Sequence, residues 1–206
     1  MKTICCYSLY KLCCIVYHYS SNLFKNKKKQ YVKQKPTISY LNGKKQSEGW
    51  YVNGGIHRED GPAYTEYYES GIIEEEIWYL NNEIHREDGP AHKLWFPDGR
   101  IHYTGWYLNG KRHRENAPAC QHWYENGNLN YEKWHLNNEI HRMDGPAYQQ
   151  WFHTGQVTEK WYLNGKEIQD KDLIRYKEWL TDNNLYNKYY TQWTDEEKVL
   201  WRLTWR

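Results

Sequence analysis

The sequence is poor in the residues that usually fill a protein core. Its 206 residues include only three Phe and two Met, against twelve Trp and twenty-one Tyr. A core normally draws on Leu, Ile, Val and Phe. Burial in this chain must therefore come from large rings whose polar tips still reach a partner or water. We expect a thin, single-layer structure rather than a thick globular core.

Cysteine and acidic residues are missing from different parts of the chain. Four of the five Cys lie in the first 14 residues, and only Cys120 lies further on. Disulfides therefore cannot hold the later residues together, and we expect a reducing compartment. Residues 1–36 carry eight Lys and no Asp or Glu, so the other residues carry 20 Lys or Arg against 26 Asp or Glu, a net charge of −6. This acidic body argues against nucleic acid or anionic lipid as a ligand of its surface.

The familiar motifs of catalysis are absent from the sequence as well. It has no nucleophile elbow, phosphate-binding glycine loop, His-Glu-x-x-His helix or Cys-x-x-Cys pair. Glu74, Glu75 and Glu76 are consecutive, and on a strand their side chains would point to alternate faces. We therefore expect no enzymatic activity, no cofactor and no metal.

A long internal repeat is what the sequence does contain. Five Trp residues recur at intervals of 28 residues, or 27 for the last, and each opens a segment of the type Trp-Tyr-x-Asn-Gly. After the first four come a His-Arg-x-Asp-Gly-Pro-Ala block and then an aromatic pair followed by Gly. Three blocks in fixed order predict an array of four units of about 28 residues. The five residues are Trp50, Trp78, Trp106, Trp134 and Trp161.

Each unit has the pattern of antiparallel strands joined by tight turns. Asn-Gly between aromatic or β-branched residues is a strong hairpin signal, because a type I′ turn needs positive φ at both central positions. Asn-Asn replaces it in two units, and Asn tolerates that region well. We expect the same logic at a second turn, which ends at Gly71 and its equivalents. Asp-Gly-Pro is expected to form a rigid loop in which Gly supplies conformational freedom and Pro fixes φ.

Two irregularities refine this interpretation. Trp106 and Leu108 share parity with each other but not with Ile101, which predicts a bulge in that strand. The last unit is one residue short in the same strand, where a bulge residue can be dropped. Residues 39–43 copy the aromatic-Gly block and predict a half-repeat at the open end, so the array is expected to span 37–167.

The pattern stops after the fifth Trp segment, and helical spacing replaces it. Residues 170–181 predict a helix behind an Asp170 cap, and a second helix begins at Thr194, where Glu197 completes a capping box. Because the last strand of an array leaves an unpaired edge, we expect residues 168–206 to form a helical lid over it. The apolar positions of the first helix are Leu173, Tyr176, Trp179 and Leu180.

The Trp-Tyr-x-Asn-Gly and aromatic-Gly blocks resemble MORN repeats, which are β-hairpin units of somewhat shorter period. The full pattern, through His-Arg-x-Asp-Gly-Pro-Ala, is similar to a longer MORN-like repeat found in proteins of giant DNA viruses, over about residues 38–167. The resemblance implies a repeat scaffold for protein or membrane contacts, without catalytic residues. The expected fold is mainly β, a single-layer antiparallel β-meander with a C-terminal α-helical cap. The expected location is cytoplasmic, meaning the host cytoplasm or the virion if the protein is viral.

The third unit departs from this pattern. Glu115, Asn116, Ala117 and Pro118 stand where the other loops have Asp-Gly-Pro preceded by one variable residue. We therefore expect the third loop to be remodelled or weaker.

Three polar residue types recur in the loops and admit two interpretations. One is a ligand or metal site in every unit. The other, which we favour, is structural: Arg pairs with Asp across the loop and His donates to a carbonyl of the next unit, since interfaces between neighbouring units stabilise repeat arrays. The positions are His57, Arg58 and Asp60; His85, Arg86 and Asp88; His113 and Arg114; and His141, Arg142 and Asp144.

The Trp and Tyr rings also leave two functions open. If they form the core of the array, the protein is a scaffold for a protein partner whose identity the sequence does not specify. Alternatively, exposed rings stack on sugars, or on bases, and the protein is a glycan-binding module of the cell-wall-binding type. Glucan- and choline-binding repeats share the Trp-Tyr-Asn-Gly content but lack the His-Arg-x-Asp-Gly-Pro-Ala block.

Residues 1–36 lie outside the repeat. Their apolar run is broken by Lys11, which makes a poor signal peptide and is too short to span a membrane. Paired Cys followed by the basic run at 25–29 allow an acylated anchor on a membrane surface. A disordered arm and a mis-assigned start codon are the alternatives.

Overall fold

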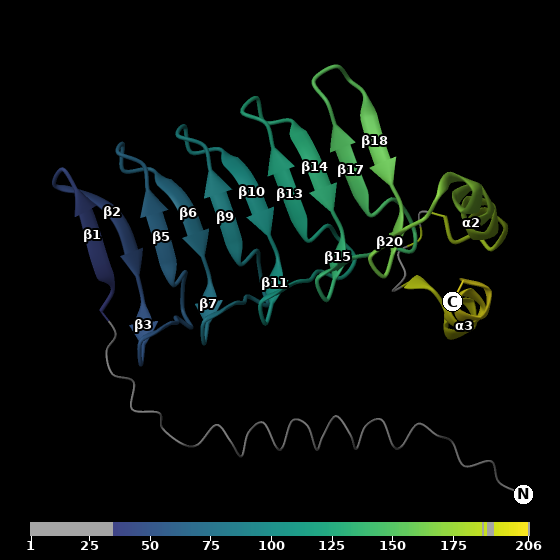
Figure 1. The fold of residues 1–206 in the computed structure, drawn as a ribbon, viewed down its shortest axis with the longest axis horizontal. Helices are drawn as coiled ribbons and strands as arrows, with labels where there is room; N and C mark the ends of the chain where they lie inside the picture. Colours follow the sequence, from purple (N-terminus) through teal and green to yellow (C-terminus); the bar gives the residue numbers. More distant parts are fainter. Residues whose placement is uncertain (1–34, 187, 189–191, 206) are drawn as a thin grey trace, which may run out of the picture. The chain divides into compact units, whose positions relative to one another are not determined.

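The fold is mainly β, as predicted: ten strands form one antiparallel sheet in which neighbours follow each other in chain order (Figure 1). The structure is a computed structural model, and it describes residues 35–186, 188 and 192–205. The predictions for the N-terminal arm therefore lie outside the described residues, apart from Lys35 and Pro36. The strands of the sheet are β1 (Thr37–Leu41), β2 (Lys44–Gly49), β5 (Tyr64–Tyr67), β6 (Ile73–Ile77), β9 (His92–Trp95), β10 (Ile101–Gly105), β13 (Cys120–Trp123), β14 (Leu129–Lys133), β17 (Tyr148–Trp151) and β18 (Val157–Lys160).

A short hairpin leaves the sheet after every second strand, and these hairpins lie along one end of the strands (Figure 1). In the first, φ is 51° at Asn53 and 81° at Gly54, as a type I′ turn requires. The Asn81-Asn82 turn has φ of 52° and 68°, so the predicted substitution of Asn for Gly is confirmed. The hairpins are β3 (Tyr51–Val52) with β4 (Gly55–Ile56), β7 (Tyr79–Leu80) with β8 (Glu83–Ile84), β11 (Tyr107–Leu108) with β12 (Lys111–Arg112), β15 (His135–Leu136) with β16 (Glu139–Ile140), and β19 (Tyr162–Leu163) with β20 (Lys166–Glu167).

The turn at the opposite end of each unit is of a different kind, so the prediction of one shared logic is wrong. Gly71 has φ of 88°, but no residue just before it has positive φ. Its N–H donates to the Tyr68 carbonyl at 2.8 Å, and the Tyr68 N–H donates to the Ile72 carbonyl at 2.9 Å. One left-handed Gly after a tight turn is enough here, because the loop is longer than two residues.

The predicted bulge is confirmed, and so is its loss in the last unit. Leu94 pairs with Tyr103 and Trp95 pairs with Ile101, which leaves His102 as an extra residue of β10. In the last unit, β17 and β18 pair without a shift of register. The missing residue of that unit is therefore the bulge residue. The equivalent extra residues of β6 and β14 are Glu74 and Asn130.

Two helices, α2 (Asp170–Asp182) and α3 (Asp195–Trp205), follow the array. The prediction of an Asp170 cap is wrong: Asp170 is the first helical residue, and Gln169 before it makes no side-chain capping bond. The capping box of α3 is confirmed, because the Thr194 N–H donates to Glu197 Oε2 at 2.5 Å and the Glu197 N–H donates to Thr194 Oγ1 at 3.2 Å. Within the described residues, no helix is long and apolar enough to cross a membrane.

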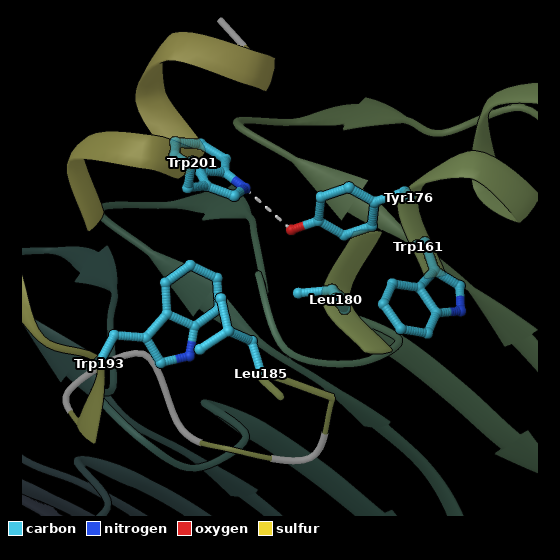
Figure 2. Close-up of a cluster of buried hydrophobic side chains, with 6 residues drawn as sticks. All are labelled: Trp161, Tyr176, Leu180, Leu185, Trp193 and Trp201. Atoms are coloured by element: carbon cyan, nitrogen blue, oxygen red, sulfur yellow. Dashed lines mark hydrogen bonds between the residues drawn. The ribbon is translucent and has the colours of Figure 1, made fainter. Parts of the chain in front are cut away.

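The helices build an apolar core over the end of the array (Figure 2). Trp161, the last Trp of the period, is only 1% exposed there. Tyr176 Oη donates to the Met143 carbonyl at 2.7 Å and accepts a hydrogen bond from Trp201 Nε1 at 3.0 Å. Met143 packs against the same core and stands where the other three loops have Glu. The other members of the cluster are Leu180, Leu185 and Trp193.

Candidate functional site

The repeated loop closes around one arginine side chain. In the first unit, the guanidinium carbon of Arg58 lies 4.2 Å from the centroid of a Trp50 ring. Its Nε donates to Asp60 Oδ1 at 2.7 Å, and its Nη1 donates to the Pro62 carbonyl at 3.2 Å. On a planar cation, stacking and edge hydrogen bonds are compatible with each other. Arg58 therefore joins the start, the middle and the end of its loop.

The glycine of the loop provides the space for this arginine. A Cβ on Gly61 would come within 2.7 Å of the guanidinium carbon of Arg58, and the same distance is found at Gly89 and Gly145. None of these three glycines has a positive φ. The expectation that Gly supplies conformational freedom is therefore wrong: Gly is needed because Arg lies against its backbone. In the second and fourth units, Arg stacks on Trp at 4.0 and 3.9 Å and Nε meets Asp at 2.8 and 2.6 Å.

The loop histidines bond to the next unit, in the direction opposite to the one expected. His57 Nδ1 accepts a hydrogen bond from the Asn81 backbone N–H at 3.0 Å, instead of donating to a carbonyl. His57 Nδ1 is therefore the acceptor in this contact between neighbouring units. The three equivalent bonds run from Asn109 to His85 at 3.1 Å, from Asn137 to His113 at 3.2 Å and from Asn164 to His141 at 3.0 Å.

Backbone hydrogen bonds reinforce this connection between units. The Arg58 N–H donates to the Tyr79 carbonyl, and the Asn82 N–H donates to the Ile56 carbonyl, both at 3.0 Å. Equivalent bonds join each later loop to the hairpin that follows it. The repeated Trp, His, Arg and Asp positions thus lie together in one contact region per unit. Their contacts are made within the chain, between each loop and the hairpin of the next unit.

The third loop differs in the way that its sequence departs from the others. Asn116 has φ of 59°, a conformation that no residue of the other three loops adopts. Ala117 stands at the position of Gly, so the loop takes another path around the guanidinium. Arg114 still stacks on Trp106 at 3.9 Å and donates from Nη1 to the Pro118 carbonyl at 3.2 Å. Burial lowers the pKa of Arg114, with no carboxylate acting against it.

A cavity of about 220 Å³ lies between the third and fourth loops. Arg114 and Asn116 border it from one loop, and Arg142, Met143 and Asp144 from the next. Trp134 and Leu136 add apolar surface. The cavity therefore combines a cation with an apolar wall at the point where the repeat is irregular.

One buried cluster was not predicted from the sequence. Tyr103 Oη donates to Cys120 Sγ at 3.6 Å, and both side chains are buried, as is Tyr107. Burial raises the pKa of the Tyr103 hydroxyl and of the Cys120 thiol. A Cβ on Gly105 would lie 2.6 Å from Tyr103 Oη. The available signal was a Gly where the neighbouring units have Ile77 and Lys133.

A second set of aromatic residues lies on one face of the sheet. Trp95 pairs across the sheet with Ile101, and the other units repeat this aromatic–aliphatic pair. Because neighbouring units also pair strand to strand, one face of the sheet carries an apolar row. Its residues are partly buried, except that Val157 at the final strand is 46% exposed. The members of this apolar row are Tyr67, Ile73, Trp95, Ile101, Trp123, Leu129, Trp151 and Val157.

Among the described residues, no group of three or more His, Cys, Asp or Glu side chains is placed to hold a metal ion. No protein-family model matches the chain, and no curated protein matches its sequence. A chain in the crystal structure of a GtfA/B complex bound to UDP and GlcNAc is similar at a TM-score of 0.23 and 9% identity. The similarity covers 78% of this chain and 29% of that chain. A similarity at this level establishes neither a shared fold nor a shared function.

Proposed function

We propose that this protein is a non-catalytic, MORN-like repeat scaffold that mediates protein–protein interactions through the apolar row of its sheet. The proposal rests on the separate positions of two sets of repeated residues in each unit. The repeated His, Arg, Asp and Trp side chains contact one another and the next unit, whereas the apolar row lies on the broad sheet. An extended row of partly exposed aromatic and aliphatic side chains suits a protein partner, since such residues are enriched in the centres of interfaces.

Glycan binding is the second candidate. Partly exposed Trp rings in a row are also a surface on which sugar rings can stack. The arrangement of the row supports a protein partner more strongly. Each Trp of the row pairs with an aliphatic residue on the neighbouring strand, so the Trp rings are separated by aliphatic side chains. A membrane-associated role depends on the N-terminal arm, which lies outside the described residues. The proposal of a viral origin rests on the resemblance alone.

The test uses the full chain with a photo-crosslinking residue at one of two positions. Position 157 lies in the apolar row, and position 111 lies on the exposed β12 hairpin strand, away from the sheet. We expect a discrete crosslinked protein from position 157 and none from position 111. Val157→Glu should reduce co-purification of that protein at least about tenfold, because burying an unpaired carboxylate is costly, while Lys111→Ala should have no effect.

Three outcomes would contradict the proposal. Crosslinking at both positions alike would show that the apolar row is not the contact surface. Retention on a glucan or choline column, released by free sugar or choline, would favour the glycan candidate. Hydrolysis or transfer of a column-bound ligand would overturn the non-catalytic assignment.

A further inference from the structure

We infer that the cavity between the third and fourth loops is a binding site for a carboxylate group on an apolar stem, with Arg114 as its ion-pair partner. The inference rests on the proposed scaffold function only for the source of the ligand, a partner protein. An acidic side chain and a C-terminal carboxylate share the chemistry that the cavity recognises. The Arg114 site is therefore defined by this chemistry rather than by a particular partner sequence.

Four arginines occupy the same position in their loops. Three have an internal carboxylate on Nε: Arg58 with Asp60, Arg86 with Asp88 and Arg142 with Asp144, at 2.6 to 2.8 Å. The fourth, Arg114, makes no ion pair and no Nε hydrogen bond with any residue that the structure describes. The substitution of Asn116 for Asp thus removes an anion from a place that the repeat otherwise fills.

The protein itself already holds the Arg114 side chain in a geometry suited to binding a carboxylate. Its guanidinium stacks on Trp106 at 3.9 Å, and Nη1 is anchored on the Pro118 carbonyl at 3.2 Å. The side chain is only partly exposed, so part of the cost of ordering and desolvating it is met by folding. A preorganised guanidinium edge pairs with a carboxylate more strongly than a flexible surface cation does.

The size and the lining of the cavity also suit a carboxylate group on an apolar stem. A volume of about 220 Å³ is below the roughly 300–1,000 Å³ of pockets for drug-sized ligands, which favours a single side chain or chain end. Trp134, Leu136 and Met143 offer apolar surface for the stem. Asp144 is engaged with Arg142 at 2.6 Å. Glu115 also lines the cavity but is exposed, and it makes no ion pair with Arg114 in the described part of the chain.

The experiment titrates the full chain with short peptides and follows the Nε–H resonance of Arg114 by NMR. One peptide carries a single Glu among apolar residues and is blocked at both ends. A second has Gln in place of Glu and a free C-terminal carboxylate, and a third has Gln and an amidated terminus. We expect a saturable shift with at least one of the first two and none with the third. The difference between the first two identifies the source of the carboxylate.

A double variant supplies the carboxylate from within the chain. Asn116→Asp with Ala117→Gly restores the loop sequence of the other units, so the new Asp should occupy Arg114 as Asp88 occupies Arg86. We expect the affinity for the acidic peptide to fall at least about tenfold, with a thermal melting temperature no lower than that of the original chain. Ala117→Gly alone is the matched control and should retain binding.

The inference is overturned if neither carboxylate peptide shifts the Arg114 resonance beyond the amidated control. It is also overturned if the double variant binds with unchanged affinity. Neither measurement needs the natural partner or the apolar row. Failure of the Arg114 site is therefore distinguishable from failure of the scaffold function, which is tested at position 157.

Discussion

The array and its helical cap bury tryptophan in two different ways. In the array, Trp50 lies under the guanidinium of Arg58 and remains partly exposed, so one polar side chain covers it. In the cap, Trp161 lies under α2 and α3 in an apolar cluster and is 1% exposed (Figure 2). The fifth Trp has no following His-Arg-x-Asp-Gly-Pro-Ala block, and the helices take the place of the missing loop. Tryptophan burial thus relies on a repeated Arg contact along the array and on a shared apolar core at its end.

Removing the ring of Trp161 should have the largest effect. We expect Trp161→Ala to lower the free energy of unfolding by about 3–5 kcal/mol, because a fully buried aromatic side chain leaves a cavity in the cap core. Trp50→Ala, in the partly exposed first unit, should cost clearly less. Urea unfolding followed by far-UV circular dichroism measures both. Equal losses would mean that the array and the cap do not differ in this respect.

Acid should weaken the array through His135, which is 6% exposed. Burial lowers the pKa of His135 from 6.5 to about 4, and the nearby Arg112 acts in the same direction. The His135 side chain therefore binds a proton near pH 6.5 in the unfolded chain, but only near pH 4 in the folded chain. Stability is full above pH 6.5 and falls as the pH drops towards 4, by about 3 kcal/mol in total.

The control for this pH dependence is His135→Tyr, which installs the residue found at positions 51, 79, 107 and 162. The difference in unfolding free energy between the two proteins, measured from pH 7.5 to pH 4, should change by that amount. Taking the difference cancels the carboxylates that titrate in both proteins. A constant difference across this range would disprove the role of His135.

Adding a methyl group to the loop glycine should have a smaller effect. We expect Gly89→Ala to cost about 1–3 kcal/mol, because its Cβ would lie 2.7 Å from the guanidinium carbon of Arg86 and overpacking strains the loop. Adding Asp88→Asn reproduces the loop chemistry of the third unit and should recover part of the loss. Thermal melting checks the three proteins. Full stability in Gly89→Ala would show that the close approach is not limiting.

The capping box of α3 should account for the smallest change. Thr194→Ala removes the hydroxyl that accepts from the Glu197 N–H at 3.2 Å, and we expect a loss of about 1 kcal/mol. The loss should appear as earlier melting of the cap, while the array is unaffected. Hydrogen exchange of amides in α3 and in β9 separates the two. Equal acceleration in both elements would mean that the cap and the array unfold as one unit.

Much of the fold was predictable because the repeat multiplies weak local signals. One Asn-Gly pair is only a hint, but its equivalents at a period of 28 residues predict hairpins at every unit. Comparison between units also predicted the bulge in β10 and its loss in β18. The second turn was predicted less well, since its Gly71 suggests positive φ without indicating how many residues share it.

The conformation of the loop depends on contacts that the local sequence pattern does not specify. Reading Gly61 as a flexible residue was reasonable from the dipeptide Asp-Gly, but its position depends on Arg58, three residues earlier, lying against it. The predicted direction of the His57 hydrogen bond was wrong, because the direction depends on whether an N–H or a carbonyl of the next unit faces the ring. The cavity beside Arg114 could be suspected from Asn116 and Ala117, but not its apolar wall, which comes from the fourth unit.

The sequence by itself determined the period, the turns with their left-handed Asn and Gly residues, the antiparallel meander and the helical end. Each of these follows from the conformational preferences of a few neighbouring residues, repeated until they are unambiguous. The tertiary structure decided that Arg lies between Trp and Gly, that His accepts from the next unit and that α2 and α3 cover Trp161. These contacts join residues whose relative positions are set only when the units stack, and packing of that kind leaves no local pattern in the chain.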